Sequence, residues 1–197
     1  MFASPSQASP PAPGPLPAPA PGLLHRLRVM LTGAPDPRTA LRPLYAAVVA
    51  AQRRPHWYRE GAVPDTIDGR FEVLALVLSL VLHRLEALGP EGIAASARLT
   101  EVFVDDMDAQ LRQIGIGDIV VGKHVGRMMG AMGGRLGAYR GAVGGTLPLD
   151  AVLIRNLYRG EPPAARALDR TTTDVRALWA ALQPRDLSSM LSGKELL

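Results

Sequence analysis

The chain of 197 residues contains no cysteine, and this absence removes several kinds of chemistry. Disulfides, cysteine-ligated zinc, iron–sulfur clusters and thiol catalysis all need that residue. The four histidines lie far apart in the sequence and show no H-x-x-x-H or similar ligand spacing. We therefore expect no metal site and no bound cofactor.

Aromatic residues make up only 5% of the chain, too few for the stacking platforms that bind single-stranded nucleic acids. The formal net charge is +4 and the sequence pI is about 9.9. Arginines are scattered along the chain instead of forming a block, which favours ordinary solvated basic faces and does not indicate specific DNA binding. A basic module that binds ribosomes or RNA stays open as an alternative.

A long hydrophobic run is also missing. Between Val73 and Leu82 only Ser79 is polar, but this run is about half of the roughly 20 residues that a membrane-spanning helix needs. Charged residues bracket it on both sides. The run is therefore predicted to be a buried central helix.

The first 22 residues contain eight of the eighteen prolines and no charged side chain. Such Pro/Ala-rich sequence has almost nothing to bury, so 1–22 is predicted to be a disordered tail. It lacks the basic and apolar regions of a signal peptide, and export is not expected. The next segment, Leu23 to Leu31, has the pattern of a short basic amphipathic helix, which either docks on the body or lies on a membrane surface.

Apolar residues recur at spacings of three and four along the rest of the chain, without a long alternating strand pattern or an internal repeat. The sequence thus predicts an all-α domain at 23–183 with six or seven helices, followed by 184–197 as a tail or a short helix. A loop is expected at 55–66, and prolines and N-cap residues mark several helix starts. The main helices are expected at about 36–54, 67–88, 90–114, 120–143, from 148, and 161–182.

The stretch from Gly117 to His124, GDIVVGKH, nearly matches a phosphate-binding loop. His124 replaces the hydroxyl that would hold magnesium, and the preceding residues have helical rather than strand spacing. Asp118 suits the N-cap of a helix that begins inside the apparent loop and runs to Val143. Lys123 is predicted to point away from the apolar stripe of that helix.

The same helix carries many glycines on the face opposite its apolar stripe, at a cost of about 1 kcal/mol each relative to alanine. Small residues at every third or fourth position let another helix approach closely, as in membrane helix pairs. We interpret this face as a partner surface, and the alternative is a weak or bent helix. Its glycines are Gly126, Gly130, Gly134, Gly137 and Gly141.

The densest polar run is PDTIDGRF at 64–71. Asp65 or Thr66 suits a helix N-cap, and acids in the first turn favour the helix dipole. Alternatively, Asp65, Asp68 and Arg70 form a polar contact site. Asp106, at the edge of the apolar stripe at 90–114, is predicted to be a buried hydrogen-bond acceptor or a partner contact.

No G-x-S-x-G or metal motif occurs, and no nucleophile, base and orienting group can be assembled from the pattern. We therefore expect a protein that is not an enzyme and has no catalytic residues.

Three stretches, VPDTIDGRF, FVDDMDAQLRQIGIGDIVVGKHV and RNLY, in this order and at these separations, resemble the ubiquinol-cytochrome c chaperone family of respiratory complex III assembly factors. The likeness covers about Leu41 to Tyr158. Each motif alone is weak, and the combination is specific.

The resemblance implies an all-helical, non-enzymatic chaperone that engages newly made cytochrome b in the cytoplasm, peripheral to the inner membrane. It also implies work near the ribosomal exit tunnel together with a small partner protein, as in mitochondrial members, where the location is the matrix side. The composition indicates a bacterial chain. The candidate client-binding residues from the motifs and the glycine face are Asp65, Asp68, Arg70, Asp106, Lys123, Gly126, Gly130, Gly137, Gly141, Arg155, Asn156 and Tyr158.

Overall fold

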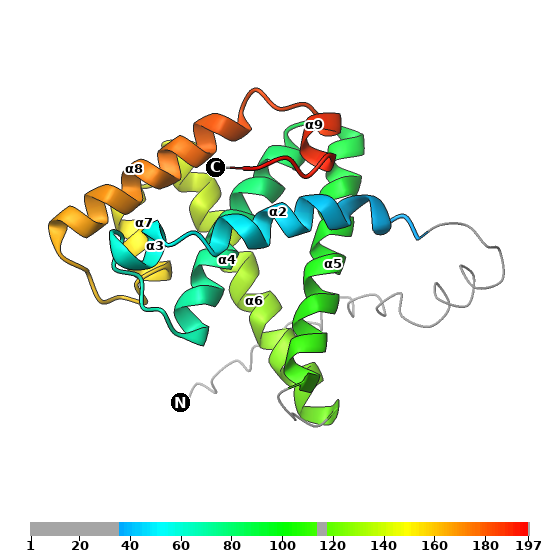
Figure 1. Cartoon of the computed structure of the whole chain (residues 1–197), viewed down its shortest axis with the longest axis horizontal. Coiled ribbons are helices and arrows are strands. Elements are labelled where there is room, and N and C mark those ends of the chain that lie inside the picture. Colours follow the sequence, from blue (N-terminus) through cyan, green and yellow to red (C-terminus); the bar gives the residue numbers. More distant parts are fainter. Residues whose placement is uncertain (1–35, 114–117, 197) are drawn as a thin grey trace, which may run out of the picture. The chain divides into compact units, whose positions relative to one another are not determined.

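The structure is a computed structural model that describes residues 36–113 and 118–196, without the side chains of 111–129. All regular elements of this part are helical, which confirms the predicted fold class (Figure 1). A 3₁₀ turn at Thr39–Leu41 precedes the first α-helix. The helices are α2 (Arg42–Gln52), α3 (His56–Arg59), α4 (Ile67–Glu86), α5 (Pro90–Gln113), α6 (Asp118–Val143), α7 (Leu149–Asn156), α8 (Ala165–Leu182) and α9 (Leu187–Leu191).

Helix α4 is the centre of the fold, as the apolar run predicts. Thr66 caps it, because its hydroxyl accepts a hydrogen bond from the backbone N–H of Gly69 at 3.1 Å. All residues from Glu72 to Leu82 are buried, and helices α2, α5, α6 and α8 pack around them. A helix that is apolar on every side needs this complete cover.

Helices α5 and α6 pack against each other and against α4 (Figure 1). Leu99, Phe103 and Met107 of α5 are buried in the core, as the spacing of apolar residues at three and four in this helix predicts. Helix α6 begins at Asp118, inside the apparent phosphate-binding loop. That stretch is therefore mainly the start of a helix.

Three sequence predictions differ from the structure. The segment 55–66 contains the short helix α3, in which Trp57 is fully buried and donates to the carbonyl of Ala51 at 3.0 Å. Helix α2 begins only at Arg42, after the 3₁₀ turn. Helix α8 begins at Ala165 instead of at 161, because the two prolines before Ala164 favour an extended backbone.

The carboxyl-terminal segment returns to the core. Asp186 caps α9 by accepting a hydrogen bond from the N–H of Ser189 at 2.7 Å. Met190 and Leu196 are 0% and 2% exposed. The predictions for 1–22 and for Leu23 to Leu31 fall outside the described residues.

Candidate functional site

The polar run before and within the first turn of α4 is held by two ion pairs. Arg70 donates from Nε to Asp65 at 2.6 Å, and its guanidinium lies 5.7 Å from the centre of the Tyr58 ring. Asp68 pairs with Arg159, which follows α7. All four charged side chains are more than half exposed, so these pairs order the surface more than they stabilise the fold.

Between these ion pairs, Ile67 exposes 85% of its surface, more than any other large apolar residue of the described part. Its position at the first turn of α4 points it away from the core that Glu72 and the following residues enter. An apolar side chain with a charged rim is a common arrangement in protein interfaces. This surface, Asp65, Ile67, Asp68 and Arg70, is called the α4 tip below.

Gly69 has a different role from its charged neighbours, because it builds the fold. A Cβ atom at this position would lie 1.9 Å from the carbonyl oxygen of Pro64. Only glycine lets the chain fold back this closely onto the start of the helix. The motif PDTIDGRF therefore combines structural residues with an exposed surface.

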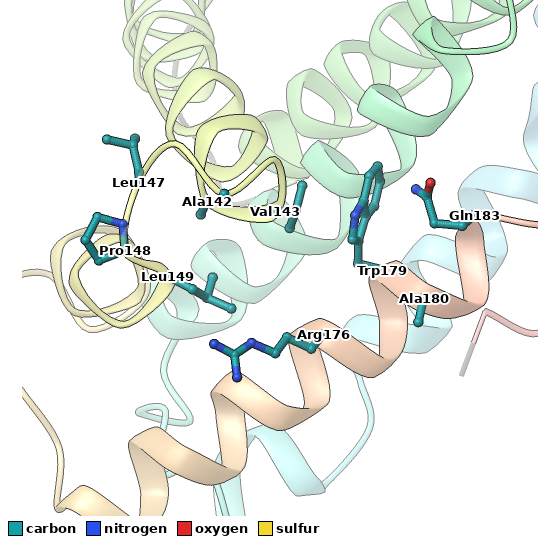
Figure 2. A pocket seen from close by; sticks show the side chains of 10 residues that line it. Ala142, Val143, Leu147, Pro148, Leu149, Arg176, Trp179, Ala180 and Gln183 are labelled. Atoms are coloured by element: carbon teal, nitrogen blue, oxygen red, sulfur yellow. The ribbon is translucent and has the colours of Figure 1, made fainter.

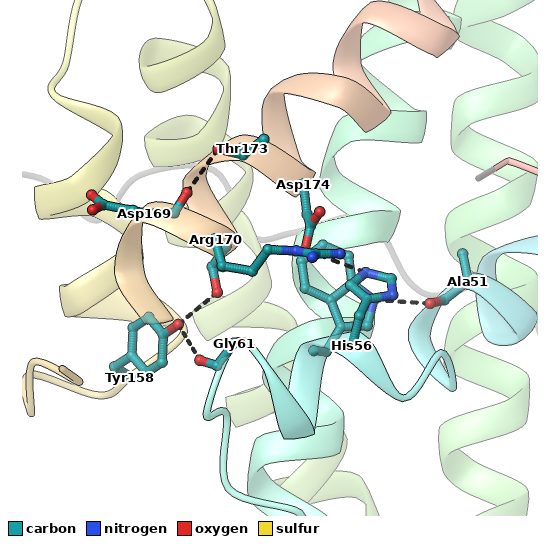
Figure 3. A network of polar contacts seen from close by, with 10 residues as sticks. Ala51, His56, Gly61, Tyr158, Asp169, Arg170, Thr173 and Asp174 are labelled. Atoms are coloured by element: carbon teal, nitrogen blue, oxygen red, sulfur yellow. Dashed lines mark hydrogen bonds and ion pairs between the residues drawn. The ribbon is translucent and has the colours of Figure 1, made fainter. Parts of the chain in front are cut away.

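The RNLY motif is divided in the same way. Tyr158 is 6% exposed, and its hydroxyl donates to the carbonyl of Gly61 at 2.6 Å and lies 2.8 Å from the hydroxyl oxygen of Thr171 (Figure 3). Asn156 donates to the carbonyl of Val152 in its own helix at 3.0 Å. Arg155 is exposed. Of these three candidates, only Arg155 lies fully on the surface.

Asp106, predicted to be a buried hydrogen-bond acceptor or a partner contact, is half-buried and accepts hydrogen bonds from its own chain. It accepts from the hydroxyl of Tyr45 at 2.7 Å and from the amide of Gln110 at 2.8 Å. Burial, and then the hydrogen bond to Asp106, raise the pKa of the Tyr45 hydroxyl. No described contact joins Asp106 to Arg70, so the two candidates belong to separate clusters.

The glycine face of α6 lies opposite its buried side. Met132 and Tyr139 face the core at 3% and 0% exposure. A Cβ atom built on Gly130, Gly133, Gly134 or Gly137 meets no atom within 4 Å. No helix of the described part covers these four exposed positions, which we call the glycine face.

The other candidate client-binding residues of α6 are Lys123, Gly126 and Gly141, and the structure describes the surroundings of Gly141 alone among these three. Gly141 is part of the fold, because a Cβ atom there would lie 2.9 Å from a methyl group of Leu147. Lys123 and Gly126 belong to α6 by their backbone, but the predicted direction of the Lys123 side chain falls outside the described residues.

The strongest polar contact between α4 and α6 was not predicted from the sequence. Arg135 donates from Nε and Nη2 to the two oxygens of Glu72 at 2.6 and 2.5 Å, and these side chains are 17% and 5% exposed. The guanidinium also lies 5.7 Å from the centre of the Phe71 ring. The available signal was Glu72 itself, a lone carboxylate beside the most apolar run of the chain.

A second polar network joins α3 to α8 (Figure 3). Asp174 accepts from Nε of Arg170 at 2.8 Å and lies 3.8 Å from Nε2 of His56. Burial lowers the pKa of His56, although Asp174 opposes this shift. The sequence did not predict this network, because His56 lies more than one hundred residues from Arg170 and Asp174.

Some arginines of the described part form ion pairs with carboxylates, and no group of metal-ligating side chains gathers there. No described helix is both long enough and apolar enough to span a bilayer. The arginines in ion pairs are Arg38, Arg54, Arg70, Arg135, Arg140, Arg159 and Arg170.

Comparison with known proteins connects this fold to one family. The family model described as Ubiquinol-cytochrome C chaperone matches residues 59–196. A crystal structure of the Cbp3 homolog from Brucella abortus is 28% identical in sequence with a TM-score of 0.69, and the match covers 87% of this chain and 94% of that chain. No curated protein matches the sequence. The chain belongs to the ubiquinol-cytochrome c chaperone family, as the three motifs predicted.

Proposed function

We propose that this protein binds newly made cytochrome b and promotes its assembly into the ubiquinol-cytochrome c reductase complex. Its family consists of chaperones for that complex, which supports the assembly role. The observation that carries the choice of client surface is the outward glycine face of α6, which nothing in the described part of the chain covers.

A glycine face suits a transmembrane client for a physical reason. Without side chains, the backbone of α6 can come close to another helix, and dispersion contacts can form along both backbones. Each exposed glycine costs the free chaperone about 1 kcal/mol of helix stability relative to alanine. Client binding would offset this cost, since Gly130, Gly133, Gly134 and Gly137 pack against nothing in the described part of the chain.

The α4 tip offers a second contact for the same client. Ile67 supplies an apolar anchor, and the exposed Asp65, Asp68 and Arg70 supply a rim that suits the polar ends of a membrane helix. Because the client is a membrane protein, we place the chaperone in the cytoplasm, peripheral to the inner membrane. Contacts with the ribosome and with a small partner protein belong to the same proposal.

The alternative of an RNA-binding module has less support. Binding to RNA requires arginines that are free to contact phosphates. Seven arginines of the described part instead form ion pairs with carboxylates of the same chain. The other arginines are spread along the chain and form no block.

Purification of the tagged protein from its native cells after brief crosslinking tests the proposal. Cytochrome b should be enriched with the wild type and reduced by Gly130→Leu combined with Gly137→Leu. Both positions have open space for a side chain, so the variant should keep its thermal unfolding temperature within a few degrees.

Ala177→Leu is the control, because it also places a leucine at an exposed helical position, on α8 instead of α6. It should leave the recovery of cytochrome b and the level of the reductase complex unchanged. Equal recovery of cytochrome b with the glycine variant and with this control would refute the glycine face as the client site.

A further inference from the structure

A second open site lies between the end of α6, the α6–α7 loop and α8 (Figure 2). The groove has a volume of about 490 Å³, in the range typical of ligand sites. Most of its wall is apolar and includes Val143, Leu149 and the ring of Trp179. Arg176 on α8 and Gln183, the residue that directly follows α8, bring a guanidinium and an amide to it.

Contacts on both sides hold the groove open. At the end of α6 the chain turns at Gly145, where φ is +78°, and the N–H groups of Thr146 and Leu147 donate to the carbonyl of Gly141 at 2.9 and 3.1 Å. On the other side, the Trp179 ring stacks on His83 of α4 with ring centres 4.9 Å apart and an interplanar angle of 6°. Both walls are thus fixed without a ligand.

The positive charge of Arg176 has no carboxylate partner among the residues that line the groove. Arg176 is exposed and forms no ion pair in the part of the chain that the structure describes. Asp150, on the neighbouring helix α7, instead accepts a hydrogen bond from Thr172 at 2.8 Å. An apolar groove with one unpaired guanidinium is complementary to an apolar ligand that carries one anionic group.

We propose that the groove binds the apolar carboxyl terminus of a partner polypeptide, with its terminal carboxylate on Arg176. Gln183 lies seven residues after Arg176, roughly 10 Å along the helix axis. An extended peptide spans about 3.3 Å per residue, so its third or fourth residue from the end reaches Gln183. The amide of Gln183 can donate to and accept from a peptide backbone, whereas it offers nothing to the alkyl chain of a fatty acid.

This site is separate from the proposed cytochrome b surface. Ala142 and Val143, which line the groove, belong to the core-facing side of α6, whereas Gly130 and Gly137 lie on its outward side. The groove can therefore accept a chain end whether or not cytochrome b is the client, and the two proposals fail independently.

Tryptophan fluorescence of the full chain provides the test. The chain has two tryptophans. Trp57 is fully buried, whereas Trp179 lines the groove, so a fluorescence change on ligand binding comes from Trp179. The probes are an N-acetylated leucine tetrapeptide with a free carboxylate, the same peptide with a carboxyl-terminal amide, and decanoate. The variant is Arg176→Gln, and Arg166→Gln is the matched control at an exposed α8 position outside the groove.

The carboxylate peptide should bind saturably, and the amide peptide should bind about tenfold more weakly, because it lacks the charge-assisted bond. Arg176→Gln should remove that preference, and Arg166→Gln should keep it. Equal binding of both peptides, binding of decanoate as tight as the peptide, or no saturable fluorescence change would each overturn the proposal.

Discussion

Helices α4 and α6 lie against each other and share the ion pair between Glu72 and Arg135, yet they use their surfaces in opposite ways. From Glu72 to Leu82, α4 is buried on every side. In its described half, α6 buries one side through Met132 and Tyr139 and leaves the glycine face open. Helix α4 is therefore structural on every side, whereas the described half of α6 has one side in the core and one side that no described residue covers.

The difference teaches how to separate structural from functional residues within a family motif. Gly69 and Tyr158, both in motifs, have close contacts inside the chain that explain them. Gly130 and Gly137 have no such contact with the described residues, although glycine weakens a helix. An unfavourable residue without an internal explanation is the better candidate for contact with a partner.

The buried ion pair between Glu72 of α4 and Arg135 of α6 should give the largest effect on stability. Arg135→Met leaves the carboxylate of Glu72 buried without its partner, so we expect a loss of about 3 kcal/mol in the free energy of unfolding. Urea unfolding followed by circular dichroism measures it. Adding Glu72→Leu should recover much of the loss. A single variant as stable as the wild type would contradict the structural role of this pair.

Alanine at two glycines tests the comparison directly. Gly69→Ala should lower stability by about 2 kcal/mol, because its Cβ atom would clash with the carbonyl of Pro64. Gly137→Ala should raise stability by about 1 kcal/mol, because its Cβ atom meets open space in a helix. Thermal unfolding of both variants measures the difference, and shifts of the same sign would break the distinction.

Two buried tyrosines, Tyr139 and Tyr158, should differ in how much stability is lost when the hydroxyl is removed. Tyr158→Phe should cost about 1–2 kcal/mol, since Gly61 and Thr171 lose the hydroxyl that they share. The hydroxyl of Tyr139, on the buried side of α6, has no hydrogen-bond partner among the described residues. Tyr139→Phe should therefore be neutral or raise stability by up to about 1 kcal/mol. Denaturant midpoints report both, and a large loss with Tyr139→Phe would disprove the second expectation.

The smallest effect concerns His83, near the end of α4. Burial, and then Arg140, lower its pKa below the ordinary value of 6.5. As the pH falls through 6.5, the unfolded chain takes up the proton first, so stability decreases with acidification. Comparing unfolding midpoints between pH 7.5 and 5.5, we expect a shallower slope for His83→Gln than for the wild type. Parallel slopes would show that His83 does not contribute.

The sequence was sufficient for the fold class, for the central helix at 67–86 and for the start of α6, because each depends on local periodicity, caps and breaks. It did not predict α3 or the late start of α8, where tertiary packing of Trp57 and two consecutive prolines decide. The packing of Trp57 is tertiary information that local pattern lacks, whereas the two prolines were visible in the sequence and lie before the helix instead of in its first turn.

The sites were harder to predict than the helices. Thr66 as a cap follows from its position alone, whereas the pairing of Asp68 with Arg159 joins residues that are 91 positions apart. The groove next to Trp179 depends on how the end of α6, the α6–α7 loop and α8 meet, which the periodicity of each helix does not reveal. Which glycines of α6 stay open likewise required the packed structure.

A photo-crosslinking residue at position 137 of α6 tests the central claim most directly. The same residue at position 177 of α8 is the control, and crosslinked products are identified by mass spectrometry after activation in native cells. The account predicts that cytochrome b crosslinks to position 137 and not to position 177. Crosslinks from position 137 to ribosomal proteins alone, or equal cytochrome b crosslinking from both positions, would contradict it.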